Sequence, residues 1–176
     1  QPLEPLGHEV VNGICVRCGE GMQLPFRDVP EDAYYCDAVV WGLSRGVVNG
    51  TTMTTFSPDL SCTRAQAVTF LWRAAGRPEP SGNTAFADVP ADSYYAAAVA
   101  WVAENGFTNG TGGGCFSPDD PCTRAQIVTF LWRAAGEPES SGSTAFADVP
   151  AGSYYAAAVA WAAENNVTNG TGSGCF

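Results

Sequence analysis

The sequence predicts an all-α protein made of tandem helix–loop–helix repeats, preceded by a small cysteine-containing segment. Two observations predict this fold: a 60-residue internal repeat, and apolar residues at helical spacing between helix-capping signals. The motif FADVPADSYY begins at Phe86, and its counterparts begin 60 positions away at Phe26 and Phe146. The predicted divisions are a Cys/His segment with a linker and three repeats, the third incomplete: 1–25, 26–85, 86–145 and 146–176.

The first helix of each repeat is expected to begin directly after the proline of the FxDVP motif, because proline suits the first turn of a helix. In the second repeat, Tyr95, Val99 and Val102 then recur at helical spacing, and Asn109-Gly110 marks a turn. The loop that follows is rich in Gly, Thr, Ser and Pro, with short extended segments expected near FxDV and near Phe56 and Phe116. Each first helix carries one tryptophan that is expected to pack in the core: Trp41, Trp101 and Trp161.

The second helix of each complete repeat opens with Thr-Arg-Ala-Gln, a pattern typical of a capping box. Thr63 with Gln66, and Thr123 with Gln126, fill the two capping positions. The face expected to be buried in the first repeat carries Ala65, Val68, Trp72 and Ala75. Gly76 and Pro78 indicate the helix end.

Charge and composition exclude several functions. The 18 acidic residues outnumber eight basic ones, all of them arginine, and give a net charge of -10. This balance argues against nucleic acid and against a polybasic membrane surface, and no apolar run is long enough for membrane insertion. The hydrophobic content of 45% predicts a folded chain. A single histidine and the absence of Ser/His/Asp, phosphate-loop or metal-hydrolase patterns argue against an enzyme.

The two ends suggest a processed chain. It begins at Gln1 without a signal peptide, so a processed or trimmed product is expected. The third repeat stops at Phe176, where the other two continue with Ser-Pro-Asp. Truncation is the favoured explanation, and a helix supplied by a neighbouring copy is the other.

Seven cysteines in an apparently secreted chain predict disulfides with one partner missing. Cys115 and Cys122 flank the FSPDDP loop and are expected to close it. Cys175 repeats the position of Cys115, and its partner would follow Phe176. Cys36 is then the expected partner of Cys62 within the first repeat.

The N-terminal segment contains His8, Cys15 and Cys18. Their spacing is compatible with three ligands of a tetrahedral zinc site. A Cys15–Cys18 disulfide is the competing interpretation, and it is favoured in an oxidising compartment. No other cofactor is expected.

Taken together, FxDVP, the tryptophan-bearing helix, NGT, FSPD and TRAQ resemble the bacterial S-layer homology family over residues 26–176. The resemblance implies a pseudo-threefold arrangement, with the first helices in a central bundle and the rest forming three prongs with grooves between them. It also implies a non-catalytic module on the bacterial cell surface that anchors a larger protein to an anionic secondary cell-wall polysaccharide, often one carrying pyruvate ketals.

The family's ligand-contacting arginine corresponds to Arg64 and Arg124. A guanidinium can hold a carboxylate through two parallel hydrogen bonds, and a helix start supplies free N–H donors. Further positions match groove-lining or scaffold residues of the family: Asp28, Asp88, Asp148, Gly50, Gly110 and Gly170.

Each of these positions also has a structural interpretation. The arginines can pair with a nearby acid, and Arg73 and Arg133, about 180° further round the helix, are expected to be structural or solvated. The aspartates can cap a turn, and the glycines can supply a positive φ. The NGT triplets also match the N-glycosylation pattern, although turn chemistry is the preferred explanation.

Two functions therefore follow from the sequence. The first is wall anchoring, in which the net negative charge leaves only local arginine contacts to attract an anionic polymer. The alternative is a structural subunit that binds copies of itself to build a surface layer or filament.

Overall fold

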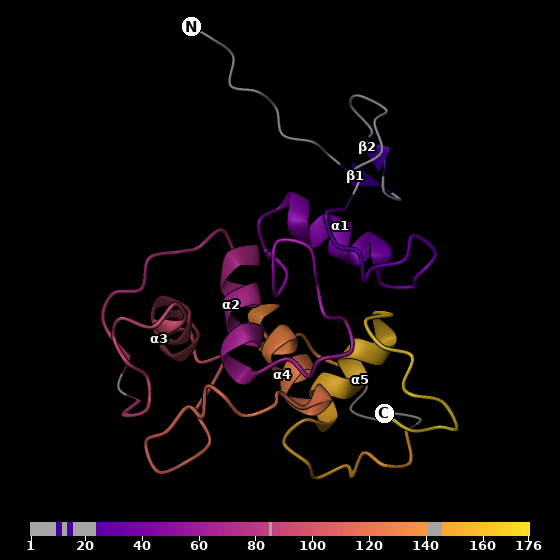
Figure 1. The fold of residues 1–176 in the computed structure, drawn as a ribbon. Coiled ribbons are helices and arrows are strands. Elements are labelled where there is room, and N and C mark those ends of the chain that lie inside the picture. Colours follow the sequence, from indigo (N-terminus) through magenta and orange to yellow (C-terminus); the bar gives the residue numbers. More distant parts are fainter. Residues whose placement is uncertain (1–9, 12–13, 16–23, 85, 141–145) are drawn as a thin grey trace, which may run out of the picture. The chain divides into compact units, whose positions relative to one another are not determined.

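The computed structural model describes residues 10–11, 14–15, 24–84, 86–140 and 146–176. Within this part of the chain lie five helices: α1 (Cys36–Ser44), α2 (Arg64–Ala74), α3 (Ala96–Glu104), α4 (Arg124–Ala134) and α5 (Ala156–Glu164) (Figure 1). Two-residue strands β1 (Val10–Val11) and β2 (Ile14–Cys15) pair antiparallel, with Val10 opposite Cys15. The predicted all-α fold is confirmed. The expected extended segments do not form strands at FxDV, Phe56 or Phe116. No described helix has the length and apolar character needed to cross a bilayer.

The first helix of each repeat begins later than predicted. The proline of FxDVP starts a tight turn, in which Ala33 N donates to Pro30 O at 3.1 Å and Cys36 N donates to Ala33 O at 2.9 Å. These i→i+3 bonds precede the α-helical pattern, so α1 starts at Cys36 and not directly after Pro30. The same turn precedes α3 and α5.

The second helix begins as predicted. In the second repeat Thr123 Oγ1 accepts from Gln126 N at 3.2 Å, and Gln126 Oε1 accepts from Thr123 N at 3.1 Å. Thr63 and Gln66 make the same reciprocal pair, so both capping boxes are confirmed. The helix end is also confirmed, since α2 stops at Ala74, shortly before Gly76 with φ of 88°.

The buried face of α2 was predicted only in part. Ala65 and Val68 are buried and Trp72 is half-buried. Ala75, by contrast, lies beyond the helix end and is exposed. The expectation for Ala75 is therefore wrong, because the chain leaves the helix before that position completes the face.

The chain divides into two compact units that do not follow the sequence repeats. The first comprises Gln1–Leu60 with Arg73–Gly76, and the second comprises Ser61–Trp72 with Arg77–Phe176. Most of α2, which belongs to the first repeat by sequence, is therefore part of the second unit. In the first unit a small core forms from Phe26, Val29 and Val39, with Phe56 packed against it.

The core of the second unit joins helices from neighbouring repeats. Val68 of α2 packs in one cluster with Val99 and Val102 of α3, together with Phe116 and Phe130. A second cluster joins α4 to α5, which lie side by side in orange and yellow in Figure 1. The second helix of a repeat thus shares a core with the first helix of the next repeat. The pseudo-threefold arrangement around a central bundle stays a prediction of the family resemblance.

Candidate functional site

The arginine of the first TRAQ motif is buried against the following repeat. Arg64 is 3% exposed, and its Nε donates to the Phe116 carbonyl oxygen at 2.8 Å. Its guanidinium carbon lies 4.7 Å from the Phe116 ring centroid and 5.8 Å from that of Phe130. The Arg64 side chain therefore joins α2 to the core of the next repeat through a charge-assisted hydrogen bond and cation–π contacts.

The charge of Arg64 is only partly compensated. Burial lowers the pKa of Arg64, while nearby Cys122, Asp120, Tyr154 and Asp88 act in the opposite direction. Within the described part of the chain, its buried Nη2 has no hydrogen-bond partner. A buried unsatisfied donor costs about 1–3 kcal/mol. An added oxygen acceptor, from water or from a ligand, would remove that cost.

The second TRAQ arginine repeats this geometry in an exposed setting. Arg124 Nε donates to the main-chain oxygen of Phe176 at 2.7 Å, and its guanidinium carbon lies 4.8 Å from the Phe176 ring centroid. Its Nη2 donates to Thr168 Oγ1 at 3.2 Å. The Arg124 guanidinium therefore combines a fixed orientation with an aromatic neighbour. That combination can bind a carboxylate.

The FxDV aspartates hold a distant loop rather than the turn that follows them. Asp88 Oδ1 accepts from Phe116 N at 2.8 Å, and its Oδ2 accepts from Ser117 N at 2.7 Å. Asp28 binds Phe56 N and Ser57 N in the same way, and Asp148 binds Phe176 N. These aspartates therefore have a structural role, as one interpretation of the sequence predicted. Their partners, however, are backbone N–H groups 28 or 29 residues away and not the turn that follows them.

The hydrogen bonds also determine the acidity of two of these groups. The N–H of Phe56 is the largest influence and lowers the pKa of Asp28; burial raises it, and the N–H of Ser57 lowers it further, so the net shift is downward. For Asp88, burial is the largest single influence and raises the pKa. The N–H groups of Phe116, Ser117 and Asp88 and the charge of Arg64 lower it, and the net shift of the Asp88 pKa is downward. Both carboxylates therefore stay ionised to a lower pH than an ordinary aspartate does.

The NGT glycines are required by backbone geometry. Gly110 has φ of 75°, and a Cβ added there would clash with the Cys115 carbonyl oxygen and lie 2.6 Å from the Phe86 ring. Gly50 and Gly170 have the same conformation and equivalent neighbours. Turn chemistry and close packing explain these three glycines.

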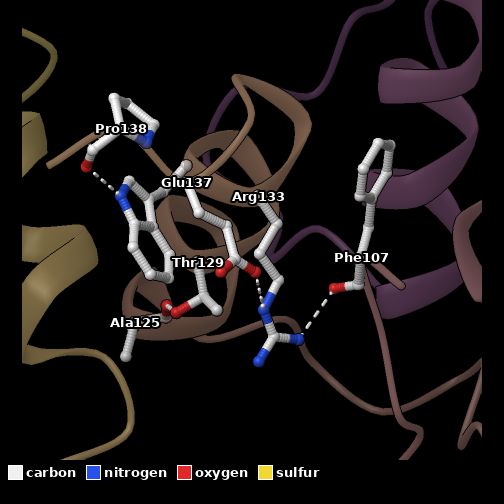
Figure 2. A network of polar contacts seen from close by, with 7 residues as sticks. Phe107, Ala125, Thr129, Arg133, Glu137 and Pro138 are labelled. Carbon is white, nitrogen blue, oxygen red and sulfur yellow. Dashed lines mark hydrogen bonds and ion pairs between the residues drawn. The ribbon is translucent and has the colours of Figure 1, made fainter. Parts of the chain in front are cut away.

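Arg73 and Arg133 are structural, as the helical spacing indicated. Arg133 Nη1 donates to the Phe107 carbonyl oxygen at 3.0 Å, and its Nε lies 3.9 Å from Glu137 Oε1 (Figure 2). Arg73 makes the matching bond to Val47 O at 3.1 Å. Both arginines tie the end of a TRAQ helix to the segment after the first helix of their own repeat.

The three tryptophans differ in exposure. Trp101 and Trp161 are half-buried and pack against core clusters, as expected. Trp41 is 47% exposed, so the expectation of core packing is wrong at this position. Its helix α1 buries Val39, Val40 and Gly42 instead.

The expected disulfides are not present in the structure, where Cys36, Cys62, Cys115 and Cys122 are free thiols. The structure therefore gives no support to the pairings of Cys115 with Cys122 and of Cys36 with Cys62. Cys115 is held in its own turn, with its N–H donating to Gly112 O at 3.0 Å. Cys122 instead shares a backbone hydrogen bond with Cys62, at 2.8 Å between Cys122 N and Cys62 O.

The expected zinc ligands cannot be placed. His8, Cys18 and the side chain of Cys15 lie outside the residues that the structure describes. In the described ranges, no group of three or more His, Cys, Asp or Glu side chains is arranged to hold a metal ion.

The main-chain partners of the arginines were not predicted. The phenylalanine of FSPD follows the TRAQ arginine of the previous repeat by 52 positions in both cases, Arg64 to Phe116 and Arg124 to Phe176. This fixed spacing is visible in the sequence, but no local pattern indicates that the two residues are in contact. Thr168, which also contacts Arg124, carried no comparable signal.

Comparison with known proteins gives a consistent result. The S-layer homology domain family matches residues 25–68, 85–128 and 145–176. A cell surface protein of Thermoanaerobacter kivui is 33% identical over 117 residues, which is 64% of this chain and 15% of that protein. An exoglucanase of Acetivibrio thermocellus is 29% identical over 157 residues, covering 86% of this chain and 14% of the enzyme.

A third relative is a surface-layer 125 kDa protein of Lysinibacillus sphaericus, 33% identical over 98 residues, or 56% of this chain and 8% of that protein. The chain thus spans less than a sixth of the length of these relatives. They are a cell surface protein, an enzyme and a surface-layer protein, so the shared segment is the part that these different proteins have in common.

Proposed function

Because this chain belongs to the S-layer homology domain family, we propose that it anchors a larger protein to the bacterial cell wall by binding an anionic secondary cell-wall polysaccharide. The family and the relatives indicate a cell-surface protein associated with the wall. The match lies in a small part of each relative, including the exoglucanase. A non-catalytic module shared by proteins of different activities is the simplest account of that distribution.

The observation that carries the proposal is the geometry of Arg124. Its Nε is held by Phe176 and its Nη2 by Thr168, so the guanidinium plane is oriented before a ligand arrives. Arg124 also lies at the start of α4. A carboxylate, such as a pyruvate ketal on a sugar, is the ligand that matches an oriented guanidinium beside helix N–H groups.

Arg64 has a different part in this proposal. Its burial between α2 and Phe116 assigns it mainly to holding the repeats together, while its buried Nη2 lacks a partner among the described residues. We therefore test ligand binding at Arg124, which makes the equivalent contact to Phe176. Arg64 supports the site through the fold.

The net charge of -10 shapes the expected binding. Long-range electrostatics repel an anionic polymer, so affinity must arise from short-range contacts at oriented arginines. Moderate salt should then weaken binding only slightly, because salt screens the general repulsion as well as the local attraction.

The test is co-sedimentation with purified sacculi, comparing native sacculi with sacculi from which the polymer has been stripped. We expect binding to native sacculi only, and a loss of at least about tenfold in Arg124→Ala, equivalent to about 1.4 kcal/mol. Arg45→Ala is the matched control, because Arg45 is also an exposed arginine. It removes the same charge and should bind like the wild type.

A second arm identifies the acidic group. Free polymer is used as a competitor before and after removal of its ketal groups, and only the untreated polymer should displace the protein. Equal binding to native and stripped sacculi would overturn the proposal. Sedimentation of the protein without sacculi would instead point to assembly with copies of itself.

A further inference from the structure

Two cysteines at equivalent repeat positions face each other across a short antiparallel contact in the second unit. Cys62 and Cys122 each precede the threonine of a TRAQ motif. Thr63 pairs with Pro121 in an isolated antiparallel bridge. Two hydrogen bonds flank it: Cys122 N to Cys62 O at 2.8 Å, and Arg64 N to Asp120 O at 2.9 Å.

This register places Cys62 directly opposite Cys122. In an antiparallel ladder, the residue before Thr63 lies opposite the residue after Pro121, and these are Cys62 and Cys122. Side chains of opposite residues project to the same face. Opposite residues that share backbone hydrogen bonds have Cα atoms about 5.5 Å apart. Disulfides most often join Cα atoms about 5.5–6 Å apart. The backbone spacing therefore suits a disulfide.

The surroundings of the two thiols support the same conclusion. Both side chains are half-buried, and Cys122 packs against the cluster that contains Val68 and Phe116. Cys62 Sγ donates to Thr63 O at 3.4 Å, a weak bond that a disulfide would replace.

We propose that Cys62 and Cys122 form a disulfide that covalently joins the start of α2 to the start of α4. The cell-surface location favours it, because disulfides persist outside the reducing cytosol. The proposal replaces the pairings expected from the sequence. It does not depend on polymer binding.

The oxidation requires a disulfide-bearing oxidant, such as oxidised glutathione or a thiol–disulfide oxidoreductase. The Cys62 thiolate attacks one sulfur of R–S–S–R, which forms a mixed disulfide and releases one thiolate. The Cys122 thiolate then attacks the Cys62 sulfur and releases the second thiolate. The two protons lost by the cysteines end on two R–SH molecules, and the two electrons reduce the oxidant.

The bond would secure the segment that covers Arg64. Pro118 O accepts from Ala65 N at 2.9 Å and Asp120 O accepts from Arg64 N, so residues 118–122 lie across the start of α2. A disulfide at the end of this segment would hold it in place. It would also close a loop of about 60 residues, which is the size range in which cross-linking restricts the unfolded chain strongly.

The first experiment is peptide mapping of the full chain after incubation with oxidised glutathione and alkylation of remaining thiols. Trypsin places Cys62 in peptide 46–64, Cys36 in 28–45, and Cys115 with Cys122 in 74–124. We expect peptide 46–64 linked to 74–124, with fragmentation locating the bond at Cys122. Cys115→Ser should retain this linked pair, whereas Cys122→Ser should lose it.

The second measurement is thermal unfolding with and without dithiothreitol. Reduction should lower the Tm of the wild type and of Cys115→Ser by about 5–15 °C. It should leave Cys62→Ser unchanged. A link from Cys62 to Cys36, a bond between Cys115 and Cys122, or full alkylation of Cys62 and Cys122 after oxidation would overturn the proposal.

Discussion

Arg64 Nε donates to the Phe116 carbonyl oxygen at 2.8 Å, across 52 residues and a repeat boundary. Arg124 and Phe176 repeat the contact at 2.7 Å. Each TRAQ arginine is thus a connector between one repeat and the next, in addition to any role in binding a ligand. The contact explains why α2 belongs to the second compact unit although its sequence belongs to the first repeat.

Removal of the Arg64 side chain should destabilise the protein. Arg64→Ala leaves a cavity against Phe116 and Phe130 and removes the donor to the Phe116 carbonyl. The expected loss in the free energy of unfolding is about 2–4 kcal/mol. Urea unfolding followed by circular dichroism measures the change.

The matched control is Arg124→Ala, which removes the same group from the exposed copy of the contact. Its loss should be below about 1 kcal/mol, because solvent replaces the lost bond. Equal losses in the two variants would contradict the assignment of Arg64 as the buried connector.

Acid should weaken the loop contacts made by the FxDV aspartates. The pKa of Asp88 is lower in the folded chain than in the unfolded chain, where it is about 3.9. Its contribution to stability is therefore present above about pH 4 and is lost as the pH falls through the folded pKa. Thermal melts from pH 6 to pH 3 should show a falling Tm, and Asp88→Asn should have a lower Tm at pH 6 with a shallower fall.

Asp148→Asn provides the comparison for Asp88→Asn. Asp148 is exposed, and its Oδ1 accepts from Phe176 N at 2.8 Å. Its replacement should lower the Tm less than Asp88→Asn does. If Asp88→Asn melted like the wild type at every pH, the two backbone bonds to Asp88 would not stabilise the loop.

Local features of the fold were predictable, because local residues determine them. Thr63 and Gln66 satisfy the same backbone donors wherever the helix is placed, so the capping box followed from the sequence. The start of α1 was missed because proline is equally compatible with a tight turn. The Pro30–Cys36 segment adopts that turn before the helix begins.

The candidate site was less predictable, because its contacts join residues that are distant in sequence. The burial of Arg64 depends on Phe116, which lies in the next repeat, and no local pattern shows it. The opposition of Cys62 and Cys122 likewise arises from pairing between repeats, whereas the sequence-based pairing considered neighbours within one repeat. The sequence does contain one indication of these contacts, because the spacing between the partners is the same in every repeat. Asp88 and Phe116, for example, are 28 residues apart.

The Cys122 thiol should react slowly in the folded, reduced protein. Burial raises the pKa of Cys122 to about 11, with Arg64 acting against the shift and Cys62 adding to it. An ordinary cysteine has a pKa near 8.5, and the thiolate is the reactive form. Alkylation by iodoacetamide at pH 8 should therefore be slower by about 100-fold in the folded chain than in urea.

Mass spectrometry of the Cys122 peptide over time measures this rate. The Arg64→Ala variant is a second test, because it removes the guanidinium that lowers the pKa of Cys122. A Cys122 thiol that reacted at the same rate in native buffer and in urea would contradict its burial.

Substitution of Gly110 should be far more harmful than substitution of a nearby glycine with a similar backbone angle. Gly110→Ala combines φ of 75° with a clash at the Cys115 carbonyl oxygen and a 2.6 Å approach to the Phe86 ring. Gly113→Ala has φ of 61° but open space around the added methyl group. It therefore isolates the backbone cost of about 1–2 kcal/mol.

We expect Gly110→Ala to lower the free energy of unfolding by about 3–5 kcal/mol, since the clash adds to that backbone cost. Neither the Cys115 carbonyl nor the Phe86 ring can retreat easily. Thr111 N donates to Cys115 O at 2.8 Å, and the Phe86 ring packs 5.8 Å from that of Phe116. Urea unfolding of the two variants under the same conditions measures both losses in the free energy of unfolding. Similar losses would mean that the positive φ alone, and not the close approach, requires glycine in the NGT motif.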